Sequence, residues 1–380
     1  MAGMRVIVSA TLGGRSAGTW YAVETARRLA TRGHDILYLS RTGHSALERA
    51  REAELPTVDD IDLEEKSPSS VFRNLGRLKA LIRQFAPDAI LAHGGEDHAY
   101  WGLAKKLHAR HLALIRVRAL DPKPPKRHLL ARWLHGRVTD LIVTANSRHY
   151  AAYQSRLGIS AERLRIIEAG IDPADFVELT EERRRANAVD LPAGKRIVVM
   201  VARFAPIKGH RVLLAGIARI KRRCADVHFL WVGYPQAYTT DALQRRLFEA
   251  NLVGDVTIID RRLPELPALL AACDVGVVAS LGSETVSRSA LEYLASGLPV
   301  VATDVGGIPD LLSRGDFGVL VPPDNPDALA EGIIALFADP ARRVACGQAG
   351  HRYVLAHCTW DQRAGQWEEA LRDAVVRARS

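Results

Sequence analysis

Residues 196–210, RIVVMVARFAPIKGH, decide the fold of this chain. The run RIVVMVA is apolar and largely β-branched, as in a strand that a parallel sheet buries on both faces. The loop RFAPIK follows it, and Gly209 with His210 then opens a helical stretch. A strand, a loop and a helix in this order form the repeating unit of an open α/β sheet.

The same unit also opens the chain. Residues 4–10, MRVIVSA, predict a strand as apolar as the one at 196–202, and a Gly-rich turn and a helix ending at Gly33 follow it. Other short β-branched runs alternate with helical stretches and predict strands at residues 35–40, 88–93, 112–117, 140–145, 227–233, 256–260, 275–280, 299–304 and 318–322. We therefore predict the α/β class, with two Rossmann-like units of similar size and helices on both faces of each sheet.

A polar segment separates the two predicted units. Residues 180–195, TEERRRANAVDLPAGK, contain a proline and a glycine and predict a linker or a helix at a domain edge. We place the first domain at residues 1–185 and the second at residues 186–357. The last segment, residues 358–380, predicts one amphipathic helix that crosses back to the first domain.

The composition is that of a globular protein large enough for two domains. Hydrophobic residues make up 48% and charged residues 25% of the 380 positions. The apolar runs are too short to span a bilayer, and the N-terminus lacks the pattern of a signal peptide. The four cysteines follow no metal-ligand spacing and predict buried thiols in a reducing compartment, so we expect a cytoplasmic protein.

Positive charge is concentrated in residues 101–137, where Trp101 and Trp133 also lie. Ten lysines and arginines stand there against one acid, Asp121, while the whole chain has a net charge of +9. One interpretation is a solvated basic face. The other is a patch that meets an anionic partner, either the cytoplasmic leaflet of a membrane or a phosphorylated acceptor. Nucleic acid is not an expected partner, because we identify no nucleic-acid-binding motif.

Ligands of open α/β sheets bind at the carboxyl ends of strands, so residues after the predicted strands are the candidate site residues. Gly13 and Gly14 follow the first strand, where paired glycines let the backbone approach a phosphate, although a plain tight turn explains them equally well. The turn is neither a GxGxxG nor a Walker loop, which argues against a dehydrogenase. His93 ends the strand at 88–93 beside two glycines, where a histidine can donate, accept or act as a base.

Two cations and two acids follow strands of the second unit. Arg203 and Lys208 lie on a loop that leads into a helix, and a guanidinium, an ammonium and a helix dipole together suit a pyrophosphate. Glu284 and Glu292 are eight positions apart, a spacing that does not place them on one helix face. These acids either contact different parts of one ligand, such as its sugar and ribose hydroxyls, or are solvated charges.

These segments together resemble the retaining GT-B glycosyltransferases of glycosyltransferase family 4. VARFAPIKGH at residues 201–210 is similar to the family's phosphate-binding strand, loop and helix. SETVSRSALEYLASGLPVVATDVGGIPDLL at residues 283–312 resembles its signature, including the Glu-x7-Glu pair and the Gly-x-Pro-Val-Val-Ala strand. ANSRHYAAYQSRLGISAERLRIIEAGIDPADF at residues 145–176 resembles the segment before the domain junction. The resemblance covers most of residues 140–355 and implies two Rossmann-like domains that face each other across a cleft.

The resemblance also implies a role for each matching residue. Arg203 and Lys208 would neutralise the donor diphosphate and stabilise it as the leaving group. Glu284 would bind hydroxyls of the donor sugar, Glu292 would bind the ribose, and His93 would lie near the reacting sugar. Backbone groups would complete the donor site, at Gly13, Gly14, Thr285, Val286 and Ser287.

The chain departs from the family's pattern in two places. Thr285-Val286-Ser287 stands where many relatives have a Gly-Phe-Gly-like run, and the extra cation Arg288 follows it. Ala169 replaces an asparagine that is frequent before the Gly-Ile-Asp triplet. These departures bear on the identity of the donor sugar more than on the type of reaction.

The implied activity is transfer of a sugar from a nucleotide diphosphate sugar to a hydroxyl of a glycan or glycolipid, with the anomeric configuration retained. We expect no cofactor besides this donor substrate and no metal, because the two cations and a helix terminus can stabilise the diphosphate. The basic window at residues 101–137 suggests a lipid-linked acceptor in lipopolysaccharide or other surface polysaccharide synthesis, met peripherally at the inner face of the membrane. A sugar-nucleotide epimerase, a phosphorylase and a non-catalytic sugar-nucleotide-binding subunit remain alternatives. The sequence leaves the nucleotide, the sugar, the acceptor and the oligomeric state open.

Overall fold

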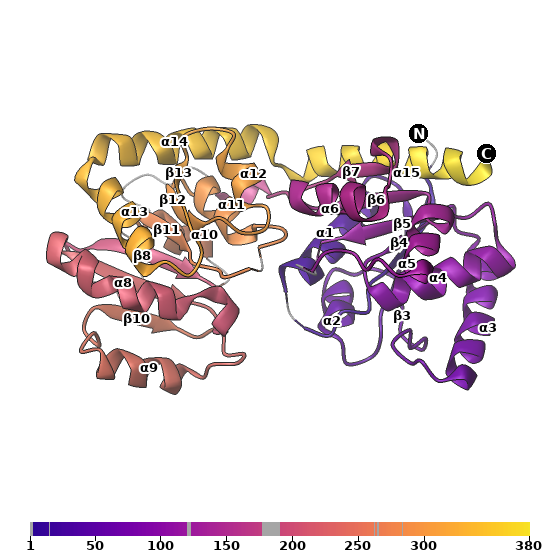
Figure 1. Ribbon diagram of the computed structural model, residues 1–380, viewed down its shortest axis with the longest axis horizontal. Helices are drawn as coiled ribbons and strands as arrows, with labels where there is room; N and C mark the ends of the chain where they lie inside the picture. The colour runs from indigo at the N-terminus through magenta and orange to yellow at the C-terminus, as the bar shows by residue number, and fades with distance from the viewer. Residues whose placement is uncertain are drawn as a thin grey trace. The chain divides into compact units, whose positions relative to one another are not determined.

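The computed structural model describes residues 3–14, 16–119, 123–176, 191–261, 263, 266–282 and 284–380. The chain forms two compact units, one of Met1–Ala169 with Trp360–Ser380 and the other of Gly170–Thr359 (Figure 1). The predicted domain boundary between residues 185 and 186 lies outside the described residues.

The first unit is built on a parallel sheet of seven strands in the order β3-β2-β1-β4-β5-β6-β7. The strands are β1 Arg5–Ser9, β2 Asp35–Leu39, β3 Thr57–Val58, β4 Ala89–Ala92, β5 Ala113–Arg118, β6 Leu141–Thr144 and β7 Leu164–Ile166. Every residue of β4, β5 and β6 is buried, as the continuous apolar runs predict for strands covered on both faces.

The second unit repeats this architecture with a parallel sheet of six strands in the order β10-β9-β8-β11-β12-β13. The strands are β8 Arg196–Val201, β9 Val227–Val232, β10 Val256–Ile259, β11 Val275–Val278, β12 Val300–Thr303 and β13 Gly318–Val321. Side chains of β8, β9 and β11 form the centre of the core together with helices α8 and α13. The predicted α/β class with two Rossmann-like units is thus confirmed.

Helices connect the strands on both faces of each sheet (Figure 1). Those of the first unit are α1 Ala17–Thr31, α2 Ser45–Glu52, α3 Pro68–Phe85, α4 Gly95–His108, α5 Leu129–Trp133 with a π turn at Leu134–Val138, α6 Ser147–Leu157 and α15 Trp360–Arg379. Those of the second unit are α8 His210–Arg223, α9 Thr240–Glu249, α10 Leu266–Ala271, α11 Arg288–Ala295, α12 Ile308–Leu312, α13 Pro326–Ala338 and α14 Pro340–His357. Three 3-10 turns lie at Ala161–Arg163, Pro173–Phe176 and Pro206–Lys208.

The C-terminal helix α15 packs on the first unit, as predicted. It contacts α1, β4, β5 and β6, and it is the yellow helix beside the strands of that unit in Figure 1. Its Trp360 and Trp367 lie with ring centroids 5.9 and 6.5 Å from that of Tyr21. These large buried rings fasten the end of the chain to α1.

The predicted strands are confirmed to within one or two residues at their ends, but two short strands were not predicted. Strand β3 has two residues and β7 has three, and both lie at an edge of the first sheet. Such short segments carry no periodic hydrophobic pattern, because an edge strand is covered on fewer sides.

Both sheets reverse their strand order next to their first strand. In the first unit the reversal lies between β1 and β4, and in the second between β8 and β11. Crevices that bind ligands in open α/β sheets lie at the carboxyl ends of such strand pairs. The loops after β1 and β4 are therefore the candidate site of the first unit, and those after β8 and β11 are the candidate site of the second unit. These loops contain nearly all of the residues that the sequence singles out.

Candidate functional site

The loop after β1 contains Gly13 and Gly14 and leads into α1. Ser16 caps α1 by accepting a hydrogen bond from the backbone N–H of Thr19 at 3.1 Å, and the Thr19 hydroxyl donates to the carbonyl of Gly14 at 2.8 Å. A Cβ added at Gly13 would come no closer than 3.8 Å to another residue, and one at Gly14 would meet nothing within 4 Å. Among the described residues, nothing would clash with a side chain at either glycine. The space beside the two glycines is therefore open, and it lies next to the N-terminus of α1.

His93 follows β4 and is 3% exposed. Its backbone N–H donates to the carbonyl of Ser9 at 2.9 Å, and its ring lies edge-on to Tyr21. Neither ring nitrogen has a hydrogen-bond partner among the described residues. Burial, with a smaller contribution from Arg116, lowers the pKa of His93 to about 3. The imidazole is therefore neutral at physiological pH. It can donate or accept a hydrogen bond, but it does not provide a positive charge.

The loop after β8 carries both predicted cations. Arg203 donates to the side chain of Gln236 at 2.8 Å, and Lys208 forms an ion pair with Glu284. Gly209 has a φ of +76°, and a Cβ there would lie 1.8 Å from the carbonyl oxygen of Ala279. Only glycine fits this position, and its contact ties the β8 loop to the carboxyl end of β11.

Glu284 lies on the loop after β11, before α11 begins. Its side chain is 5% exposed, and its Oε1 accepts from Lys208 and, at 2.5 Å, from the hydroxyl of Ser280. Its carbonyl accepts from the N–H of Gly307 at 2.9 Å and leaves no space for a side chain at Gly306. The loops after β8, β11 and β12 thus converge on this one residue.

Ser287 and Glu292 continue this site into α11. Ser287 has a φ of +49°, a left-handed conformation that is strained for any residue with a Cβ, and Thr285 and Val286 before it are buried. Glu292 is on α11 and accepts from the guanidinium Nε of Arg288 at 2.8 Å. The extra cation noted in the sequence is therefore the partner of the acid expected to bind ribose.

In the second unit, the loop after β8 carries Arg203 and Lys208. The loop after β11 carries Glu284, Thr285, Val286 and Ser287, and Glu292 follows on α11. The ion pair of Lys208 with Glu284 joins these two loops, whereas Arg203 is bonded to Gln236 on the loop after β9. Gly13, Gly14 and His93 lie on two neighbouring loops of the first unit. The sequence analysis did not single out Ser280, Gln236 or Tyr21. Gln236 and Tyr21 are far in sequence from Arg203 and His93, which they contact, so no local pattern links them. Ser280 is only four residues from Glu284, and its position directly after β11 is the signal that could have identified it.

Three of the ten cations in residues 101–137 are buried, so the prediction of an exposed basic surface is wrong for them. Lys105 is buried and paired with Asp140, and Arg116 and Arg118 are buried in β5, where they donate to backbone carbonyls. Arg116 and Arg118 are buried because both faces of β5 are covered, so side chains on either face of the strand lie inside the unit. Lys105 is buried on α4, where Asp140 neutralises its charge. Seven cations of the window remain exposed, at Lys106, Arg110, Lys123, Lys126, Arg127, Arg132 and Arg137.

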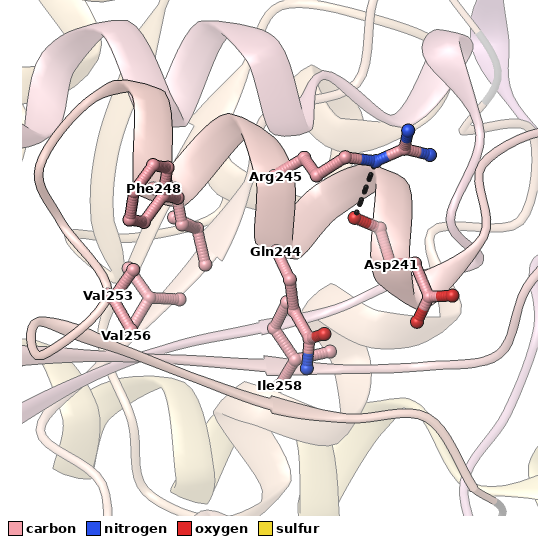
Figure 2. Close-up of a pocket in the computed structure, with 8 residues that line it drawn as sticks. Asp241, Gln244, Arg245, Phe248, Val253, Val256 and Ile258 are labelled. Atoms are coloured by element: carbon pink, nitrogen blue, oxygen red, sulfur yellow. Dashed lines mark hydrogen bonds between the residues drawn. The ribbon is translucent and has the colours of Figure 1, made fainter.

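A separate pocket of about 820 Å³ lies between α9 and β10 (Figure 2). It is lined by Asp241, Gln244, Arg245, Leu247, Phe248, Val253, Val256 and Ile258, and Figure 2 shows Arg245 bonded to the backbone of Asp241. None of the predicted site residues lines it.

Among the described residues there is neither a helix suited to cross a membrane nor a group of side chains suited to hold a metal ion. None of its helices combines the length and the hydropathy that crossing a membrane requires. No group of three or more histidines, cysteines or acids within it is arranged to hold a metal ion. All four cysteines are buried and form no disulfide.

Two family models match successive parts of the chain. Residues 18–175 match the model described as Glycosyltransferase Family 4, and residues 195–339 match the one described as Glycosyl transferases group 1.

Curated relatives and solved structures agree with these matches. The chain is 29% identical to D-inositol 3-phosphate glycosyltransferase of Corynebacterium glutamicum over 57% of its length and 53% of that relative. It is 30% identical to a GDP-mannose-dependent phosphatidylinositol monomannoside mannosyltransferase of Mycolicibacterium smegmatis over 60% of its length and 62% of that relative. The match therefore spans less than two thirds of either relative.

The structure of Anabaena HepE in complex with UDP superposes with a TM-score of 0.83 at 19% identity, covering 97% of this chain and 100% of the other. The family models and the fold identify this chain as a GT-B protein that resembles glycosyltransferase family 4.

Proposed function

We propose that this chain transfers a sugar from a nucleoside diphosphate sugar to a hydroxyl of an anionic acceptor, with the anomeric configuration retained. The observation that carries the proposal is the buried ion pair of Lys208 with Glu284 at the point where the second sheet reverses its order. Arg203 lies on the same loop as Lys208. Lys208 beside the segment that leads into α11, with a second cation on its loop, suits a diphosphate, and the buried acid that pairs with Lys208 suits sugar hydroxyls.

The donor binds by exchanging partners within this site. Lys208 leaves Glu284 for the diphosphate, and Glu284 then accepts hydrogen bonds from the donor sugar. Arg203 binds the same diphosphate, and both cations stabilise the negative charge that develops on the leaving group. Glu292 binds the ribose, and the backbone at Thr285 and the two following residues binds the sugar and a phosphate. This charge stabilisation needs no divalent metal.

We propose that two loops of the first unit also contact the donor. His93 offers a neutral imidazole to a hydroxyl of the donor sugar, since both of its ring nitrogens lack partners in the described part of the chain. The Gly13–Gly14 loop offers backbone groups to the donor phosphates at the N-terminus of α1.

An anionic, lipid-linked acceptor is supported by the surface of the first unit. Helix α5 exposes 85% of Leu129 and 62% of Leu130, and the exposed cations Lys126, Arg127 and Arg132 lie within three residues of this pair. Such a combination suits the interface of an anionic membrane. The names of both curated relatives include an inositol phosphate group. We place the chain in synthesis of a surface polysaccharide, lipopolysaccharide or phosphorylated glycolipid, bound peripherally at the inner face of the membrane.

The donor is tested with a panel of UDP-glucose, ADP-glucose, GDP-glucose and GDP-mannose, first by thermal shift and then by release of nucleoside diphosphate. We expect one donor to bind, and release to require an acceptor such as D-inositol 3-phosphate or a phosphatidylinositol mannoside. Conversion of the donor to its epimer, with no acceptor and no release of nucleoside diphosphate, would instead support an epimerase. Binding without any consumption would support a non-catalytic subunit.

The membrane contact is tested by flotation with phosphatidylglycerol vesicles at low salt. We expect the wild-type protein to float with the vesicles and the variant L129E/L130E to remain in the soluble fraction. Phe72→Glu is the matched control, because Phe72 on α3 is 83% exposed in the same unit. Equal flotation of both variants would contradict the assignment of α5, and no flotation of the wild type would contradict the membrane contact itself.

A further inference from the structure

One buried carboxylate joins the two loops of the first unit that carry Gly13–Gly14 and His93. Asp97 is on the first turn of α4 and is 0% exposed. Its Oδ2 accepts from the backbone N–H groups of Thr11 at 3.1 Å and of Gly94 at 2.7 Å. Its Oδ1 accepts from the hydroxyl of Thr11 at 2.5 Å. Thr11 belongs to the loop after β1, and Gly94 directly follows His93.

The backbone on both sides of His93 is held from a second direction. Arg116 of β5 is 4% exposed and donates to the carbonyl of Ala92 at 3.1 Å and to the carbonyl of Gly94. A Cβ at Gly94 would lie 2.4 Å from Asp97 Oδ2, so the loop is pressed against the carboxylate. The N–H of Gly94 is thus bound by Asp97 and its carbonyl by Arg116.

Burying the Asp97 carboxylate costs free energy, and two strands can be joined without a fully buried acid. A buried carboxylate is disfavoured unless hydrogen bonds satisfy it, and an apolar residue of the same size would leave two buried N–H groups without a partner. The same two strands are joined at their opposite ends by Asp88, which accepts from the N–H of Arg5 at 3.0 Å and is partly exposed. Fastening β1 to β4 therefore does not by itself require a fully buried acid.

We propose that Asp97 is a positioning residue that sets the distance between the Gly13–Gly14 loop and His93. This inference rests on the proposed function, in which both segments contact the donor. Asp97 itself contacts no substrate. It acts through Thr11 and Gly94, so its loss displaces two donor contacts together.

The test compares D97A and D97N with D88A, using the whole chain. In D97N the side-chain carbonyl oxygen can accept from both backbone N–H groups and the amide can donate to the Thr11 hydroxyl, so kcat should stay within about 3-fold of wild type. D97A should lower kcat by about 100-fold, as expected for misplacement of reacting groups by roughly 1 Å. D88A should keep kcat and lower the melting temperature by less than D97A, because Asp88 is partly exposed and accepts a single backbone hydrogen bond, from Arg5. Thr11→Val, which loses only the hydroxyl bond, should lower kcat by about 5-fold and serves as the test if D97A does not fold.

A second readout does not depend on turnover. Hydrogen exchange of peptides that cover residues 9–14 and 93–98 should accelerate in D97A and not in D88A. Three results would overturn the role of Asp97 as a positioning residue. The first is equal kcat in D97A and D88A. The second is a loss of kcat in D97N as large as in D97A, and the third is unchanged hydrogen exchange in D97A. If the wild type transfers no sugar but hydrogen exchange accelerates in D97A, the proposed function is wrong. The role of Asp97 in holding the two loops together is then still supported.

Discussion

The ion pair between Lys208 and Glu284 makes stability and turnover separable by mutation. The side chains are 13% and 5% exposed, so Lys208→Met leaves the carboxylate of Glu284 buried, with the Ser280 hydroxyl at 2.5 Å as its remaining donor among the described side chains. Removing one partner of a buried pair costs about 3–5 kcal/mol, and because Ser280 stays in place we take about 3 kcal/mol. For a unit of this size, that loss lowers the melting temperature by about 6–12 °C.

The double variant K208M/E284Q separates the two effects. It buries no charge, and the amide introduced at position 284 can still accept from Ser280, so its stability should return to within about 1 kcal/mol of wild type. Its turnover should stay at least about 100-fold below wild type, because the cation that stabilises the departing diphosphate is missing. Differential scanning calorimetry and release of nucleoside diphosphate measure the two quantities. A double variant as unstable as K208M would refute the claim that the unpaired Glu284 carboxylate causes the loss of stability. Wild-type turnover in K208M would refute the role of Lys208 in stabilising the departing diphosphate.

Three other predictions rest on single features. Gly209→Ala should destabilise the second unit by at least about 2 kcal/mol, because its Cβ would overlap Ala279, whereas Gly254→Ala, with nothing within 4 Å, should melt close to wild type. Burial lowers the pKa of His93 and His135 to about 3, so below pH 6.5 these histidines bind protons in the unfolded chain but not in the folded one. The free energy of unfolding should therefore fall by about 1 kcal/mol per histidine per pH unit from about pH 6 to 4. A melting temperature that does not change over this pH range would contradict the prediction. Treatment with EDTA should leave turnover unchanged, and recovery of a lost activity by Mg²⁺ or Mn²⁺ would argue against metal independence.

Much of the fold was predictable from sequence because parallel strands buried on both faces are unbroken apolar runs. RIVVMVA and VGVVA carry this signal in a few residues, and the glycines and polar residues after them mark the loops. The positions of Arg203 and Glu284 followed from the same argument, since residues after such strands share one edge of a sheet.

Pairing between distant residues was not predictable in the same way. Lys208 and Glu284 are 76 positions apart, and Asp97 and Thr11 are 86 apart, so no local pattern links them. The burial of Arg116 was also missed, because a charge run in sequence does not reveal which of its members lie on a strand covered by helices. These are properties of packing, and they appear only when the sheet is assembled.

Formation of a glycoside from a nucleoside diphosphate sugar tests the central claim most directly. Purified protein is incubated with the donor that binds best and a panel of phosphorylated and lipid-linked acceptors, and the isolated product is analysed by NMR, with K208M/E284Q as the folded control. We predict a new glycosidic bond with the anomeric configuration of the donor, formed only when both substrates are present and lost in the control variant. Tight donor binding with no transfer to any acceptor in the panel, or equal product from the control, would contradict the account.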